Sequence, residues 1–118
     1  MTTSISRVFA AQHIGGTCII RLSPMQIDPS NCDAVFYELL SFIKEVQPSR
    51  VVINMRKVEY LHSVAIGWLM ALNREIMNYD GDLVVCSLEN QARETLAITR
   101  VDRFFDICDS ERAALIVA

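Results

Sequence analysis

Residues 51–55 read Val-Val-Ile-Asn-Met and lie between two segments with helical periodicity. Four of these five side chains are apolar, and they do not alternate with polar ones. A strand with one solvated face alternates, whereas a strand in the middle of a sheet covered by helices forms a nearly continuous apolar run. We therefore predict a sheet with this strand at its centre, its side chains buried and helices packed on it.

The segment before this strand is predicted to be a helix that starts near Asp28 and ends at residues 47–49. Asp28 is expected to be the N-cap, and Pro29 suits the first helical position because an N–H there has no partner within the helix. The apolar residues of the segment recur at steps of three and four and so share one face. They are Cys32, Val35, Phe36, Leu39, Leu40, Ile43 and Val46.

The rest of the chain alternates between strands and helices. Residues 13–16 are predicted to be a hairpin turn, because Gly-Gly between β-prone runs supplies positive φ without steric cost. The other expected elements are strands at 7–12 and 17–22, a helix at about 63–78, a strand at 83–86, a helix at about 90–98, a strand at 104–108 and a short helix through Val117 that Ser110 caps. The order β-β-α-β-α-β-α-β-α predicts one α/β domain with a mixed sheet, since alternating elements pair in parallel and the hairpin is antiparallel.

Length and composition describe one folded domain over residues 1–118. The chain is 52% hydrophobic and 21% charged, and its net charge is −3. Nucleic acid is excluded as the main partner, because its eleven Lys and Arg residues form no cluster. No run approaches the ~18 apolar residues of a membrane span, and the N-terminus does not resemble a signal peptide. We expect a cytoplasmic protein that is not inserted in a membrane.

The four cysteines, Cys18, Cys32, Cys86 and Cys108, are an even number, so a disulfide framework has to be considered. They lie far apart, in segments predicted to be strand, helix, strand and strand. No pair has the spacing of a zinc or redox motif. We expect free thiols that serve as small apolar core residues in a reducing compartment.

Signatures of catalysis and of cofactors are absent from the sequence. Gly15-Gly16 stands alone, so the chain has no glycine-rich phosphate loop. Neither His13 nor His62 has a cysteine or carboxylate at metal-ligand spacing. No nucleophile-elbow sequence surrounds any serine. We therefore expect a protein that is not an enzyme and holds no metal and no cofactor.

Residues 60–67, Tyr-Leu-His-Ser-Val-Ala-Ile-Gly, join the strand region to the second helix. Ser63 stands where an N-cap belongs, with its hydroxyl placed to accept a hydrogen bond from the Ile66 N–H. Capping alone would account for a serine here. A serine at a helix N-terminus is also a natural phosphorylation site, because free N–H groups and the positive end of the helix dipole favour a phosphate. Both interpretations stay open at this point.

Several blocks of the chain resemble the STAS family (sulphate transporter and anti-sigma factor antagonist domains). They are residues 51–55, residues 58–63 (Val-Glu-Tyr-Leu-His-Ser), Ile66-Gly67 and residues 81–86 (Gly-Asp-Leu-Val-Val-Cys). Their spacing and the order of elements match the family over about residues 8–115. The resemblance implies a single STAS-type domain, closest to the stand-alone anti-sigma factor antagonists.

In those antagonists a strand leads into Asp-Ser-(Ser/Thr)-Gly-(Leu)-Gly at a helix start, and a partner kinase that is also an anti-sigma factor phosphorylates the first serine. The unphosphorylated antagonist captures the partner and frees the sigma factor. Ser63 matches that serine, and Gly67 matches the last glycine. The resemblance thus implies a bacterial transcription regulator with Ser63 as candidate phosphoacceptor. The implied partner-binding residues are Met25, Asp28, His62, Ser63, Val64, Ala65 and Gly67.

The motif departs from the family at three positions: His62 replaces aspartate, Val64 replaces the second hydroxyl residue, and Ala65 replaces glycine. A protonated histidine neutralises part of a phosphate's charge, whereas an aspartate adds to it. The changes indicate a divergent partner or a member that has lost phosphorylation. Two rival functions stay open: an unphosphorylated STAS subunit or scaffold, for example in a transporter-associated complex, and a small-ligand binder or enzyme that uses the groove beside His62 and Ser63.

The end of the third helix carries one further departure. Residues 98–101 read Ile-Thr-Arg-Val, with Arg100 where the family often has a helix-ending glycine. Glycine suits the left-handed conformation of that position. We predict either a positive φ at Arg100 or a helix end of a different shape.

Overall fold

The computed structural model describes residues 2–5, 9–22, 30–56, 58 and 61–116. Its elements follow the alternation predicted from the sequence, with one additional strand at the N-terminus. In chain order they are β1 (Thr2–Ile5), β2 (Phe9–Ile14), β3 (Thr17–Leu22), α1 (Cys32–Val46), β4 (Arg50–Asn54), α2 (Ser63–Asn78), β5 (Asp82–Cys86), α3 (Asn90–Ile98), the 3-10 helix η1 (Val101–Arg103), β6 (Asp106–Cys108) and α4 (Glu111–Ile116).

The six strands that the described residues form make one mixed sheet in the order β1-β2-β3-β4-β5-β6. The first three are antiparallel neighbours, and β3 to β6 are parallel. Strand β4 lies between β3 and β5, and its residues Val51, Val52 and Ile53 are fully buried. The predicted central strand and the mixed sheet are confirmed. The prediction lacked β1, because a short, polar edge strand has no periodic signal of its own.

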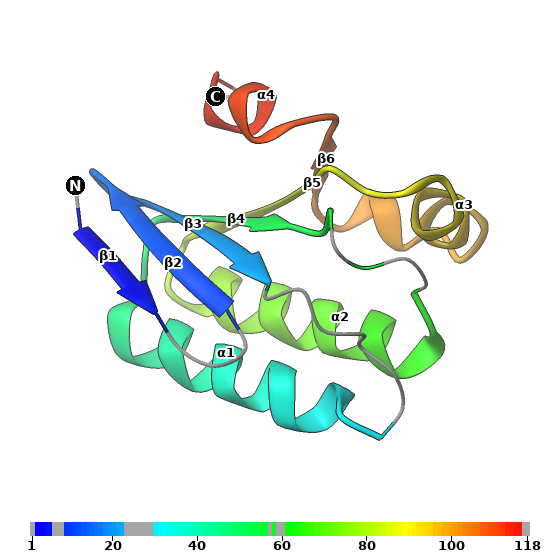
Figure 1. Cartoon of the computed structure of the whole chain (residues 1–118), viewed down its shortest axis with the longest axis horizontal. Helices are drawn as coiled ribbons and strands as arrows, with labels where there is room; N and C mark the ends of the chain where they lie inside the picture. The colour runs from blue at the N-terminus through cyan, green and yellow to red at the C-terminus, as the bar shows by residue number, and fades with distance from the viewer. Residues whose placement is uncertain (1, 6–8, 23–29, 57, 59–60, 117–118) are drawn as a thin grey trace.

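Helices cover the two faces of the sheet unequally. Figure 1 shows α1 and α2 side by side on one face and the short helix α4 on the other. The larger core fills the space between the sheet and the α1–α2 pair. A smaller cluster, made by Ile19, Val52, Val84, Cys86 and Ala114, lies on the α4 side. Strand β4 contributes to both clusters, which is why its sequence is a continuous apolar run.

The start of α1 differs from its prediction. The predicted cap and first residue, Asp28 and Pro29, lie outside the described residues, and Asn31 is the N-cap of the helix, which begins at Cys32. Residue Asn31 accepts the first intrahelical bond at its carbonyl, from the Val35 N–H at 3.1 Å. The helix ends as expected, at Gln47, whose positive φ of 50° and N–H bond to the Ile43 carbonyl close the last turn.

The hairpin turn is also shorter than predicted. Strand β2 continues through His13 and Ile14, which pair with Cys18 and Thr17 of β3. Only residues 15–16 form the turn, and Gly15 has a φ of 61°. The Gly-Gly pair therefore makes the two-residue turn without help from its neighbours.

The last strand, β6, is shorter than predicted. It covers Asp106–Cys108 and not 104–108, because η1 and the bend after it occupy the preceding residues. Phe105 is buried, whereas Phe104 is 54% exposed. Two phenylalanines next to a strand favour a strand prediction, but here one ring is buried and the other is exposed.

Two predictions about helix ends are confirmed. Arg100 has a φ of 60° and follows the C-cap residue Thr99 of α3. Ser110 caps α4, since its Oγ accepts a hydrogen bond from the Ala113 N–H at 3.1 Å. The predicted last residue of that helix, Val117, lies outside the described residues.

The cysteines occupy the elements predicted for them, with Cys18 in β3, Cys32 in α1, Cys86 in β5 and Cys108 in β6. All four are free thiols, three of them buried. Among the helices of the described residues, none combines the length and apolar character needed to cross a membrane.

Candidate functional site at the start of helix α2

The residues predicted at the start of α2 divide between surface and core. Ser63, Val64 and Gly67 are exposed, and His62 is half-buried. Ala65 is 1% exposed and belongs to the main core, which contradicts its expected contact with a partner. Successive helical residues are rotated by about 100°, so a residue two positions after an exposed serine points to the opposite side. The surface consists of His62, Ser63, Val64 and Gly67.

Ser63 is not the N-cap of α2, which corrects the sequence prediction. His62 has the extended conformation of a cap, with φ −91° and ψ 170°, and its carbonyl accepts a hydrogen bond from the Ile66 N–H at 3.1 Å. Within the described part of the chain, no side chain caps the helix. The Ser63 hydroxyl is thus exposed on the first helical residue and is not used to cap the helix. Capping does not account for this serine.

The first turn of α2 lies at the positive end of the helix dipole. The N–H groups of Ser63, Val64 and Ala65 have no partner within the helix, and the turn contains no acidic residue to offset the dipole. An anion attached to Ser63 would therefore be stabilised by the helix. Among the described residues, no base accepts a hydrogen bond from the Ser63 hydroxyl, so the geometry suits a modified serine better than a catalytic nucleophile.

The imidazole of His62 is a further feature of this turn. Both of its ring nitrogens are shielded from solvent, and neither has a hydrogen-bond partner in the described part of the chain. A buried polar atom without a partner costs free energy. Residues 59–60, which immediately precede this turn, lie outside the described residues, as do the predicted contact residues Met25 and Asp28.

Contacts from two other helices hold Leu61 and Trp68, which lie before and after the first turn of α2. The indole Nε1 of Trp68 donates to Asp33 Oδ1 of α1 at 2.7 Å, and its ring stacks on Phe36 with centroids 6.2 Å apart. On the other side, the Leu61 N–H donates to Gln91 Oε1 of α3 at 3.2 Å. Local sequence could not predict these contacts, because the partners are 30 or more positions apart in the chain. The acidic residue Asp33 in the first turn of α1 was the one local feature that indicated a polar contact there.

In the described residues, no group of three or more His, Cys, Asp or Glu side chains could hold a metal ion. The site therefore consists of an exposed hydroxyl at a helix N-terminus, an adjacent half-buried histidine and a small apolar surface made by Val64 and Gly67. This arrangement can accept a phosphoryl group and can contact a protein.

Comparison with known proteins identifies the family. The model of the STAS domain matches residues 8–114. The chain belongs to the STAS domain family. This STAS domain is 23% identical over 104 residues to the anti-sigma F factor antagonist of Paenibacillus polymyxa, with 88% of each chain covered.

Solved structures share its fold. An anti-sigma factor antagonist (STAS) domain protein from Planctomyces limnophilus superimposes with a TM-score of 0.80 at 19% identity, covering 92% of this chain and 95% of the other. The Bacillus cell fate determinant SpoIIAA in its phosphorylated form gives a TM-score of 0.66 at 15% identity, covering 91% and 96%. At these identities the similarity shows the fold, and the role of individual residues rests on the site geometry.

Proposed function

We propose that this STAS domain is a regulatory protein-binding module of the anti-sigma factor antagonist type, and that phosphorylation of Ser63 controls its binding to a protein partner. The observation that carries the proposal is the exposed Ser63 hydroxyl on the first residue of α2, which no capping bond employs. The module acts by binding and not by catalysis. The partner is an anti-sigma factor that is also a serine kinase.

A phosphate at this position would change binding without unfolding the domain. It adds a charge of about −1.5 to −2 at pH 7, which the dipole and the N–H groups of the first turn stabilise. The neighbouring surface of Val64 and Gly67 is uncharged. A partner matched to a neutral hydroxyl would have to desolvate the new charge against this surface, so its affinity falls.

The relatives support this proposal in two ways. One is named an anti-sigma F factor antagonist, and SpoIIAA, which shares the fold, exists in a phosphorylated form. His62 sets this chain apart from the family motif, in which an aspartate precedes the serine. The phosphate would therefore stand beside an imidazole and not beside a carboxylate.

The deciding experiment uses the partner purified from the native host after capture by this domain. We expect Ser63→Asp to lower the affinity at least about tenfold, or ~1.4 kcal/mol, in calorimetric titration, while the melting temperature is kept. Ser110→Asp is the matched control, because Ser110 is also a serine at a helix N-terminus but caps α4 on the other face of the sheet. It should leave the affinity unchanged.

Phosphorylation itself is measured by incubating the domain with the purified partner and ATP and mapping phosphopeptides. We expect Ser63 to be modified and Ser63→Ala to remain unmodified. If Ser63→Asp binds as tightly as the wild type and Ser63 stays unmodified, the phosphoswitch is wrong. The domain would then be a constitutive subunit of a larger complex.

A further inference from the structure

The outer face of α2 carries an apolar groove that continues beyond the Ser63 surface. Its volume is about 490 Å³, and it extends from Gly67 to Asn78 along the helix, a rise of roughly 16 Å. Its walls combine apolar side chains of α2 with one from the segment between η1 and β6. The lining residues are Gly67, Met70, Ala71, Asn73, Arg74, Met77, Asn78 and Phe104.

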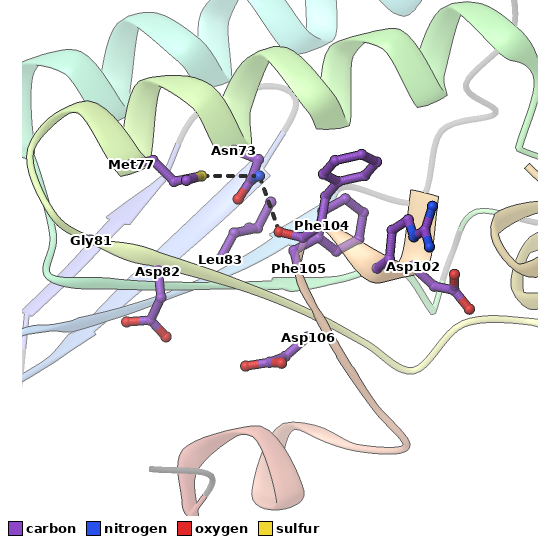
Figure 2. A pocket seen from close by; sticks show the side chains of 10 residues that line it. Asn73, Met77, Gly81, Asp82, Leu83, Asp102, Phe104, Phe105 and Asp106 are labelled. Atoms are coloured by element: carbon purple, nitrogen blue, oxygen red, sulfur yellow. Dashed lines mark hydrogen bonds between the residues drawn. The ribbon is translucent and has the colours of Figure 1, made fainter. Parts of the chain in front are cut away.

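A buried amide builds the wall of this groove. Asn73 is 6% exposed, and its Nδ2 donates to the Phe104 carbonyl at 3.2 Å and contacts the Met77 sulfur at 3.5 Å (Figure 2). The bond to the carbonyl holds the backbone of Phe104 against α2, whereas the contact with Met77 lies within α2. Phe104 is 54% exposed and Met77 is 60% exposed. Large apolar side chains gathered at a surface mark an interaction site.

Charge along the groove has one sign. Among the described residues that line the groove, Arg74 alone carries a charge, and this residue is exposed. Among the described residues, Arg21, Arg50 and Arg93 each form an ion pair, and Arg74 forms none. The groove therefore presents an unpaired positive charge beside apolar side chains.

Negative charge lies on the other side of Phe104. A second hollow of about 240 Å³ is lined by three carboxylates together with Arg103, and it shares Asn73, Met77 and Phe104 with the groove. The carboxylates belong to Asp82, Asp102 and Asp106 (Figure 2). An acidic segment would be attracted by Arg74 and repelled beyond Phe104, so it must lie along α2.

We propose that this groove docks an acidic amphipathic helix of the protein partner, laid along α2. Apolar side chains of that helix, spaced three and four residues apart, would contact Met70, Met77 and Phe104, and one carboxylate would pair with Arg74. Flexible methionines suit such a contact because they adapt to the shape of a helix. Gly67 belongs both to the groove and to the Ser63 surface, so one partner could contact the two together. The inference therefore rests on the proposed function and names the chemistry of its partner.

A designed helix tests the groove without the natural partner. The probe is a Leu/Glu amphipathic peptide of about 18 residues, or five turns, and its control has the same leucines with Lys in place of Glu. In a domain with ¹³C-labelled methionine methyl groups, the Leu/Glu peptide should shift the signals of Met70 and Met77 to saturation. The signal of Met55, which is fully buried, should stay in place. The Leu/Lys peptide should bind at least about tenfold more weakly.

A charge reversal provides the second measurement. Arg74→Glu should invert the preference, so that the Leu/Lys peptide binds more tightly than the Leu/Glu peptide. Arg103→Glu, in the neighbouring hollow, is the matched control and should keep the wild-type preference for the acidic peptide. Equal shifts with both peptides, or an unchanged preference in Arg74→Glu, would overturn the proposal. So would concentration-dependent self-association that shifts Met70 and Met77 in the free domain, because the occupant would then be a second copy of the chain.

The purified partner separates this inference from the proposed function. If Ser63→Asp abolishes its binding and Arg74→Glu does not, the groove is wrong and the phosphoswitch stands. If Arg74→Glu weakens binding and Ser63→Asp does not, the groove stands and the phosphoswitch is wrong.

Discussion

At Arg100 the chain adopts a left-handed backbone conformation, with φ 60° and ψ 21°. The β-carbon of a non-glycine residue crowds the backbone there at a cost of order 1 kcal/mol. The position follows the C-cap of α3, where glycine is the usual residue. The exposed Arg100 makes no ion pair among the described residues. Its strain is therefore not offset by a charge contact.

Arg100→Gly should raise the free energy of unfolding by up to about 1 kcal/mol and the melting temperature by a few degrees. Glycine also increases the conformational entropy of the unfolded chain, which lowers the free energy of unfolding, but the relief of strain is the larger effect. Thermal unfolding followed by circular dichroism measures the effect. Thr99→Gly is the control, because Thr99 has a φ of −81° and gains nothing from glycine, so this variant should be less stable than the wild type. A destabilised Arg100→Gly would contradict the strain argument.

Two serines at helix starts differ in their bonds and should differ in their contribution to stability. Ser110 Oγ accepts from the Ala113 N–H, whereas α2 has no side-chain cap. Ser110→Ala should cost about 0.5–2 kcal/mol, the usual value of an N-cap. Ser63→Ala should cost less than about 0.5 kcal/mol, as is common for exposed residues. Urea denaturation compares the two, and equal losses would show that Ser63 caps α2 in solution.

At the scale of elements, one carboxylate fixes α4 to the sheet. Glu111 accepts two hydrogen bonds from Arg21 of β3, at 2.8 and 2.7 Å, and a third from Asn54 of β4. The hydrogen bonds from Arg21 lower the pKa of Glu111, with a smaller contribution in the same direction from Asn54. A helix of six residues could not form in isolation, so these bonds and the burial of Ala114 hold it.

The lowered pKa of Glu111 predicts an acid dependence of stability. Its contribution is complete above the ordinary pKa of 4.5 and is lost as the pH falls through the lower pKa of the folded state. Glu111→Gln lacks this carboxylate. The variant should therefore be less stable than the wild type at pH 7, and its free energy of unfolding should fall less on acidification. Urea unfolding over a pH series measures it. Glu38→Gln, at an exposed position of α1, is the control and should keep the wild-type profile.

At the scale of the whole molecule, the packed interior protects the thiols. Cys18, Cys32 and Cys86 are fully buried, and Cys108 is half-buried. Burial raises the pKa of Cys18 to about 11 and raises that of Cys86 as well. A thiol with a raised pKa holds little of the reactive thiolate at neutral pH.

Alkylation at neutral pH should therefore modify Cys108 first, and the three buried thiols should react through opening of the fold. In urea without reductant, intact-mass measurement should find all four cysteines alkylated. Fewer than four would reveal a native disulfide and would contradict both the free thiols and the expected reducing compartment. Folded wild type with and without added reductant provides the control.

Much of the architecture could be predicted from local sequence, because the features concerned are periodic over neighbouring residues. The apolar run at 51–55 predicted the central strand, and the helices expected at about 63–78 and 90–98 match α2 (Ser63–Asn78) and α3 (Asn90–Ile98). At position 100, where the resembling family often has glycine, we predicted either a positive φ or a differently shaped helix end, and Arg100 has a positive φ. The exposure of Ser63 also followed from its place at the start of a helix.

Other features depend on contacts between residues far apart in the chain. Strand β1 exists through its pairing with β2, and α4 is held by Arg21, 90 positions from Glu111. The role of His62 as N-cap, the Trp68–Asp33 bond and the exposed Phe104 ring likewise required the tertiary structure. Periodicity reports which face of an element is apolar, but not which partner covers that face. The groove along α2 could not be predicted for this reason, because part of its wall comes from Phe104, 31 positions from Asn73.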